Sequence, residues 1–195
     1  MSTIKKATSP FTDECHALAD DYWIESLNDG THVLIRPLQP KDREREFAFV
    51  SHLARSGRFR FMGSFSPAQA SLLDQLMDID YRNRMAYVAL VHENGQLIEI
   101  GVSRYGAFEG DHHCEFAVAV AEGWRRRGLG RLLMGHLIDS ARRHGFDSMA
   151  AMDTSSNELM RDMARKYGFE CHADKQDASQ IIYKYALGDK DEAGY

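Results

Sequence analysis

The sequence predicts a single α/β (α+β) domain built on a mixed sheet of six to seven strands, with helices on both faces. Two observations predict this fold class. The first half of the chain alternates apolar and polar residues around short turns, as hairpins do. The second half alternates short apolar strands with amphipathic helices, as strand–helix–strand crossovers do. Hairpins give antiparallel pairs and crossovers give parallel ones, so we expect both kinds of pairing in one sheet.

Length and composition fit one globular domain. The chain has 195 residues, of which 44% are hydrophobic, and its formal net charge is -5. We expect residues 1–20 to form an N-terminal arm, residues 21–188 the single domain and residues 189–195 a flexible tail. The sequence shows neither an apolar run of about 18 residues nor a signal peptide, so we expect a cytoplasmic protein without a membrane partner. The acidic balance argues against nucleic acid as a partner.

The first half carries the turn signals of hairpins and the start signals of two helices. Asn28-Asp29-Gly30 predicts a tight hairpin between the two apolar segments that flank it. Pro40-Lys41-Asp42 opens a helix that runs to about Arg55, and Ser66-Pro67 opens a second. Three further strands are expected at Met85–His92, Leu97–Tyr105 and His113–Val120.

The second half alternates strands with helices. Apolar residues at i, i+3 and i+4 spacing in Leu129–Ala141 predict an amphipathic helix that ends at Gly145. Ser155 and Glu158 have the spacing of a capping box and predict the start of another helix, which Gly168 stops. Strands are expected before and after this last helix, at Phe146–Met152 and Gln180–Leu187.

The segment Cys114–Arg131 predicts an anion-binding site. It reads as a strand, a basic loop, two glycines and an amphipathic helix. The first amides of a helix have no intrahelical acceptor, and the helix dipole adds positive potential there. Gly128 and Gly130 let a phosphate approach the backbone. The alternative is a solvated run of charges before an ordinary helix. The positive charge comes from Arg125, Arg126, Arg127 and Arg131, of which at most one or two can face one ligand.

Other nucleotide and metal motifs fit less well. The Gly-x-x-x-x-Gly-Lys-Ser/Thr run of a P-loop does not occur. A dinucleotide fingerprint would need glycine where Leu133 stands, although Asp153 has a plausible spacing for a ribose contact. His112-His113-Cys114 makes a poor metal site, because neighbours on a strand point to opposite faces. We therefore expect no metal.

The anion-site residues resemble the Gcn5-related N-acetyltransferase (GNAT) family. Arg125–Gly130 matches the family signature Gln/Arg-x-x-Gly-x-Gly/Ala, and Asn157 and Gly168-Phe169 match a later family segment. Val118-Ala119-Val120 is similar to the strand end that, in the family, splays at a bulge and pairs with the pantetheine arm of coenzyme A. The resemblance covers about residues 31–187 and implies a GNAT-like, mostly antiparallel sheet.

Four shorter segments resemble the acetyltransferase domain of bacterial protein lysine acetyltransferases. They are Ile35-Arg36-Pro37-Leu38, Arg58-Phe59-Arg60-Phe61, Asp80-Tyr81 and Cys114-Glu115-Phe116-Ala117-Val118. The arginines of the second segment are expected to line the entrance for the acceptor.

The resemblance implies direct transfer of an acetyl group from acetyl-CoA, as co-substrate, to a primary amine, with a protein lysine as one candidate. Glu115 is the candidate base, because a glutamate in this context is catalytic in the lysine acetyltransferases. Its alternative role is a solvent-facing or arginine-paired strand carboxylate. Asn157 could bond the pantetheine or cap a helix. The implied donor-binding residues are Val118, Ala119, Val120, Arg125, Arg126, Arg127, Gly128, Leu129, Gly130, Arg131 and Asn157.

One position departs from the family pattern. Many GNAT enzymes carry a tyrosine where this sequence has Ala164, and that tyrosine protonates the departing thiolate. Tyr167 is expected to be core. The departure motivates a second hypothesis, a catalytically inactive module of the same fold that senses acyl-CoA or regulates a partner. A dinucleotide-binding oxidoreductase is the third. The sequence carries no signal for the acceptor, the acyl length or the oligomeric state.

Overall fold

The computed structural model describes residues 21–55 and 69–188. In this part of the chain eight strands form one sheet in the order β1-β2-β3-β4-β5-β6-β8-β7. Neighbouring strands are antiparallel except β5 and β6, which are parallel. The predicted mixed, mostly antiparallel class is therefore confirmed. The expected arm, the Ser66-Pro67 helix start, Arg58–Phe61 and the tail lie outside the described residues.

The strands and helices have the following bounds. The strands are β1 (Trp23–Ser26), β2 (His32–Pro37), β3 (Arg84–Glu93), β4 (Gln96–Gly106), β5 (His113–Val120), β6 (Ser148–Thr154), β7 (Glu170–Ala173) and β8 (Gln180–Ala186). The α-helices are α2 (Arg43–Arg55), α3 (Gln69–Met77), α4 (Leu129–Arg143) and α5 (Glu158–Tyr167). Single 3-10 turns form at η1 (Pro40–Asp42) and η2 (Glu122–Trp124).

Two local expectations were wrong. The sheet has one strand more than predicted, because β7 is a short edge strand whose four residues are all exposed and therefore show no apolar alternation. The last helix does not use Ser155 as its cap. Asn157 is the N-cap, and its side chain accepts a hydrogen bond from the backbone N–H of Met160 at 3.2 Å.

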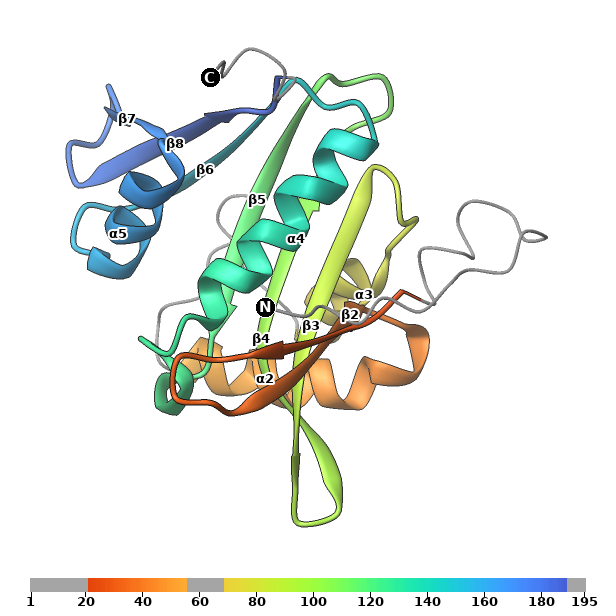
Figure 1. Cartoon of the computed structure of the whole chain (residues 1–195). Coiled ribbons are helices and arrows are strands. Elements are labelled where there is room, and N and C mark those ends of the chain that lie inside the picture. The colour runs from red at the N-terminus through yellow and green to blue at the C-terminus, as the bar shows by residue number, and fades with distance from the viewer. Residues whose placement is uncertain (1–20, 56–68, 189–195) are drawn as a thin grey trace, which may run out of the picture.

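The sheet separates two layers of helices. Figure 1 shows α4 and α5 on the near face and α2 and α3 behind the sheet. The larger core lies under α4 and α5, and a second core lies under α2 and α3. Gly101 in β4 lets α4 pack closely on the sheet, because a Cβ at this position would lie 3.0 Å from Cδ1 of Leu133.

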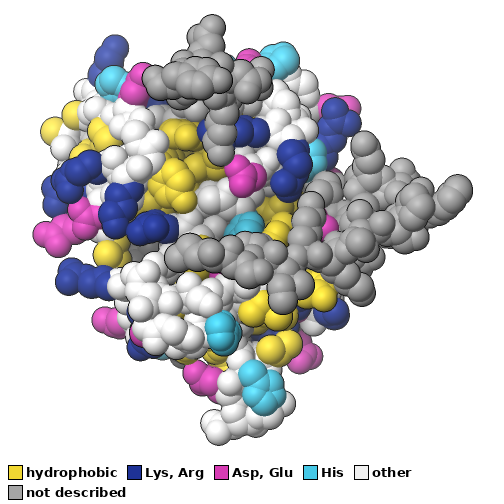
Figure 2. Space-filling model, viewed as in Figure 1, with side chains coloured by type: hydrophobic (Ala, Val, Ile, Leu, Met, Phe, Trp, Pro, Cys, Tyr) yellow, Lys and Arg dark blue, Asp and Glu magenta, His cyan; other side chains and the backbone are white. Residues whose placement is uncertain are grey.

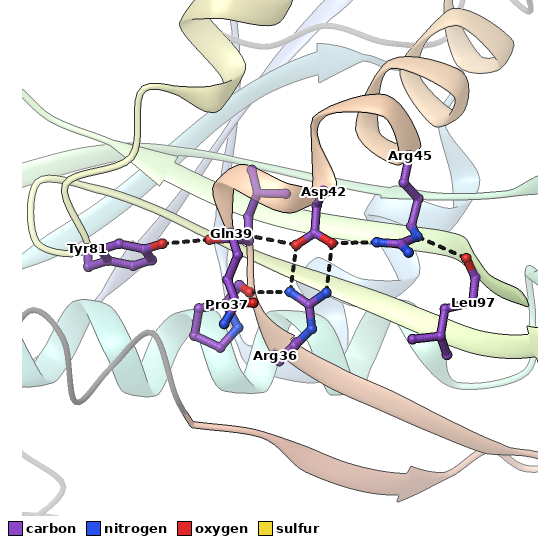
Figure 3. A network of polar contacts seen from close by, with 8 residues as sticks. Arg36, Pro37, Gln39, Asp42, Arg45, Tyr81 and Leu97 are labelled. Carbon is purple, nitrogen blue, oxygen red and sulfur yellow. Dashed lines mark hydrogen bonds and ion pairs between the residues drawn. The ribbon is translucent and has the colours of Figure 1, made fainter.

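A buried carboxylate fixes the start of α2 (Figure 3). Asp42 is fully buried and accepts hydrogen bonds from Arg36 Nη1 at 2.6 Å and Arg36 Nη2 at 2.7 Å. Arg45 and the backbone N–H of Gln39 also donate to it. Burial raises the pKa of Asp42, but these donors outweigh it and hold the pKa below its usual value. The charged turn is thereby tied to β2.

A second set of charged side chains is buried between α2 and the sheet. Arg104 of β4 donates to Oε1 of the buried Glu46 and, at 3.1 Å, to the carbonyl of Leu76. Glu99 is 5% exposed, and its carboxyl group lies beside that of Glu46. Burial, with the nearby charge of Glu46, raises the pKa of Glu99 to about 10. Glu99 is therefore protonated at neutral pH.

Candidate functional site

Strands β5 and β6 separate after a short parallel contact. They pair only from His113 with Ser148 to Glu115 with Ala150. Beyond this point β5 stays paired with β4 and β6 stays paired with β8. Figure 1 shows the two strands meeting near the top of the view and then diverging. One backbone edge of β5 therefore has no neighbouring strand past Glu115 among the described residues.

The direction of the free backbone groups follows from the β4–β5 register. The N–H of Ala121 donates to the carbonyl of Ile100 at 2.9 Å, and the register runs without a shift from Gly101–Val120 to Gly106–Glu115. In an antiparallel pair, alternate residues direct both backbone groups at the partner. Ala117 and Ala119 therefore bond β4, while Val118 and Val120 point into the gap. The β4–β5 register shows no bulge at Val118–Val120, and the gap opens because β6 diverges from β5.

The start of α4 lies at the same end of β5. Arg131 and Leu132 donate their backbone N–H groups to the carbonyl of Gly128, at 3.1 and 3.2 Å, and the earlier amides of Leu129 and Gly130 precede any intrahelical acceptor. The side chain of Leu129 is 1% exposed and anchors the helix in the core. A Cβ at Gly130 would lie 3.8 Å from Cγ2 of Val120. The open amides and the free edge of β5 are therefore neighbours.

The basic loop before α4 uses its arginines in different ways. Arg125 donates from Nε to the carbonyl of Val120 at 3.2 Å. Arg127 pairs with Asp29 at 3.0 Å, and its guanidinium lies 4.8 Å from the centroid of the Trp124 ring. Arg126 and Arg131 are exposed, and neither makes an ion pair within the described residues. Two of the four cations are thus held by the protein itself.

The face that carries α4 and α5 is suited to a ligand with a charged end. Figure 2 shows Lys and Arg side chains gathered around an exposed hydrophobic patch on this face.

Within the described residues, no group of three or more His, Cys, Asp or Glu side chains is arranged to hold a metal ion. No helix in that part of the chain has the length and hydropathy to cross a bilayer.

Glu115 lies at the apex of the gap on the opposite face of the sheet. It pairs with Gly106 of β4 and Ala150 of β6, and its side chain is exposed. Its neighbours along β5, Cys114 and Phe116, face the core instead. Side chains therefore alternate between the two faces of the sheet in this part of β5. Val118 follows Glu115 by three residues, about 10 Å along an extended strand.

Several other side chains near the gap have structural roles. The cap role of Asn157 is present, and its Nδ2 also donates to Asp153 at 2.6 Å. Ala164 is fully buried, and Tyr167 is half-buried with its hydroxyl donating to the carbonyl of Arg131 at 2.7 Å. Burial raises the pKa of the Cys114 thiol to about 12, so this cysteine is a poor nucleophile.

Sequence reasoning missed the β1–β2 hairpin as part of this region. The backbone N–H of Asn28 donates to the carbonyl of Arg127 at 2.9 Å, next to the Asp29–Arg127 ion pair. The segments are about a hundred residues apart, and turn signals describe only the local chain. The Asn28-Asp29-Gly30 signal located the turn but could not identify its contact.

Fold and site together define an α/β protein with an open strand edge beside a helix start whose first backbone amides have no intrahelical acceptor. A model of the Acetyltransferase (GNAT) family matches residues 47–169. A Pseudomonas aeruginosa protein named Acetyltransferase PA5475 is 50% identical over 188 residues, which is 96% of this chain and 100% of that protein. The chain therefore belongs to the GNAT family and is an N-acetyltransferase.

More distant relatives share the fold. Acetyltransferase Pat of Mycolicibacterium smegmatis is 28% identical over 73% of this chain, which spans 42% of the length of Pat. The GNAT domain of S. lividans PAT has a TM-score of 0.71 at 21% identity, covering 85% of this chain and 96% of that domain. The structure of yncA from Salmonella typhimurium with its cofactor acetyl-CoA has a TM-score of 0.63 at 22% identity, covering 83% and 96%.

Proposed function

We propose that this enzyme transfers an acetyl group from acetyl-CoA directly to a primary amine, and that the amine is a lysine side chain of a protein. The observation that carries the proposal is the free backbone edge of β5 beside the first amides of α4. The yncA structure, which has the same fold, holds acetyl-CoA as its cofactor.

The donor would bind along both features. The diphosphate of acetyl-CoA would accept hydrogen bonds from the backbone amides of Leu129 and Gly130, where the helix dipole favours negative charge. The exposed Arg126 and Arg131 would add charge around it. The pantetheine arm would then extend along β5 and pair with the backbone of Val118 and Val120, as an additional strand would.

The acetyl group would lie near the apex of the gap. A free lysine amine has a pKa of about 10.4, so it must lose a proton before it attacks. Glu115 would accept that proton, directly or through water. The tetrahedral intermediate carries its negative charge on the former carbonyl oxygen, and the N–H of Val118 is the nearest unpaired donor on the free edge. A thiol has a pKa of about 8.5, so coenzyme A can leave as a thiolate.

The lysine assignment rests on resemblance rather than on a pocket. The segments Ile35–Leu38, Asp80-Tyr81 and Cys114–Val118 are similar to bacterial protein lysine acetyltransferases. Two of the chain's relatives are named Pat or PAT. A net charge of -5 suits a cationic acceptor in general.

The test is the Glu115→Gln variant with lysine peptides and polyamines as acceptors. Release of the coenzyme A thiol measures turnover, and calorimetry measures the affinity for acetyl-CoA. We expect kcat to fall by about 10²–10⁴-fold, as for loss of a general base, with the Kd of acetyl-CoA nearly unchanged. Glu109→Gln, an exposed glutamate in the turn before β5, is the matched control. Equal losses of turnover and affinity would reject Glu115 as the base.

A further inference from the structure

The tip of the β1–β2 hairpin is docked onto the loop that precedes α4. The N–H of Asn28 donates to the carbonyl of Arg127 at 2.9 Å, and Asp29 pairs with the Arg127 guanidinium at 3.0 Å. The other carboxylate oxygen of Asp29 accepts from the N–H of Thr31 at 3.0 Å, which holds the turn itself. The hairpin tip and the start of α4 therefore form one structural unit.

This docking brings the side-chain amide of Asn28 to the start of the helix. A Cβ at Gly128 would lie 3.0 Å from Oδ1 of Asn28 and 3.4 Å from its Nδ2. Gly128 is the N-cap of α4, with a φ of 92°. The next two residues are Leu129 and Gly130, whose amides are the proposed diphosphate donors. The Asn28 side chain thus lies against Gly128, the residue that immediately precedes these amides.

Asn28 has donor capacity available for a ligand. Its side chain is exposed and makes no hydrogen bond with any residue that the structure describes. A primary amide offers two N–H donors and no charge. The nearby Arg127 is already committed to Asp29 and to the Trp124 ring. The side-chain amide of Asn28 is therefore available to donate a hydrogen bond to a ligand at the start of α4, whereas the guanidinium of Arg127 is already used within the protein.

We propose that Asn28 helps to bind acetyl-CoA, because its side-chain amide donates a hydrogen bond to the diphosphate. The Asp29–Arg127 pair holds the hairpin tip in place for this contact. The inference rests on the proposed function, because it takes the start of α4 as the diphosphate site. It adds the β1–β2 hairpin to that site, and with it a residue outside the 47–169 family match.

The test compares Asn28→Ala with Asn28→Asp in the full chain, using coenzyme A as the probe in calorimetric titrations. Loss of one hydrogen bond from this exposed amide should weaken binding by at least about two- to tenfold. The aspartate has the same shape and suits a turn equally well, but its charge would face the diphosphate. We therefore expect at least about tenfold weaker binding at low salt, with the difference between the variants shrinking as salt screens the charges.

The control is Asn94→Asp at the tip of the β3–β4 hairpin, which makes the same charge change in another turn. Melting temperatures without ligand identify variants that have lost the fold. Unchanged affinity for coenzyme A in both Asn28 variants would overturn the inference, as would an equal loss in Asn94→Asp. Failure of the unaltered protein to bind coenzyme A would instead overturn the proposed function.

Discussion

The Glu99→Gln variant should remove a pH-dependent loss of stability. Glu99 is 5% exposed, and burial raises its pKa from 4.5 to about 10. Between these pH values the folded chain binds one proton more than the unfolded chain, so the free energy of unfolding falls as pH rises. The loss is at most about 1.4 kcal/mol for each pH unit, or up to about 3 kcal/mol between pH 5 and pH 7.

The variant keeps the shape of the protonated carboxyl without its titration. Its amide can donate to the neighbouring carboxylate of Glu46 in place of the protonated carboxyl. We therefore expect equal stability of the two proteins near pH 5. The variant should become the more stable one as pH rises toward 8, because only the unaltered chain must keep its proton.

Urea denaturation at one-unit steps from pH 5 to pH 8 measures this difference. Glu93→Gln, an exposed glutamate at the end of β3, controls for the loss of one carboxylate. A constant difference between Glu99→Gln and the unaltered protein across the range would refute the reasoning. It would mean that Glu99 is ionised in the folded chain.

Three further substitutions separate structural roles from binding of acetyl-CoA. Asn157→Ala removes the cap of α5 and should lower the free energy of unfolding by about 1 kcal/mol, as measured with urea. If Asn157 also holds the pantetheine arm, the variant should bind acetyl-CoA more weakly in calorimetry. Unchanged affinity would show that Asn157 acts only as the cap. Gly128→Ala should cost about 1–2 kcal/mol because of its left-handed φ and should weaken coenzyme A binding. Gly130→Ala meets no atom closer than 3.8 Å, so it should keep the stability and lose only affinity. Equal stability of the two glycine variants would contradict this account.

Local signals in the sequence were sufficient for most elements of the fold. The Asn28-Asp29-Gly30 turn lies between β1 and β2 as predicted, and β5 has the predicted bounds His113–Val120. Gly145 follows the end of α4 with a φ of 79°. These features depend on neighbours within a few residues, which is the range that turn and periodicity rules cover. The four exposed residues of β7 carry no such pattern.

Long-range contacts between polar residues could not be predicted. Glu46, Glu99 and Arg104 appear in the sequence as ordinary charged residues, which are almost always exposed unless paired. Their burial depends on α2 packing against β4, which no local pattern encodes. The role of Arg127 was likewise invisible, because its partner Asp29 lies in the first hairpin. The sequence identified a basic loop but not which arginines the protein itself would use.

The central claim is that coenzyme A binds to backbone amides at the start of α4 and along the free edge of β5. Amide-resolved NMR during a titration with coenzyme A tests it directly. We predict that the amides of Val118, Val120, Leu129 and Gly130 shift and exchange more slowly with solvent as the ligand saturates. Binding heat without any change at these amides would contradict the account.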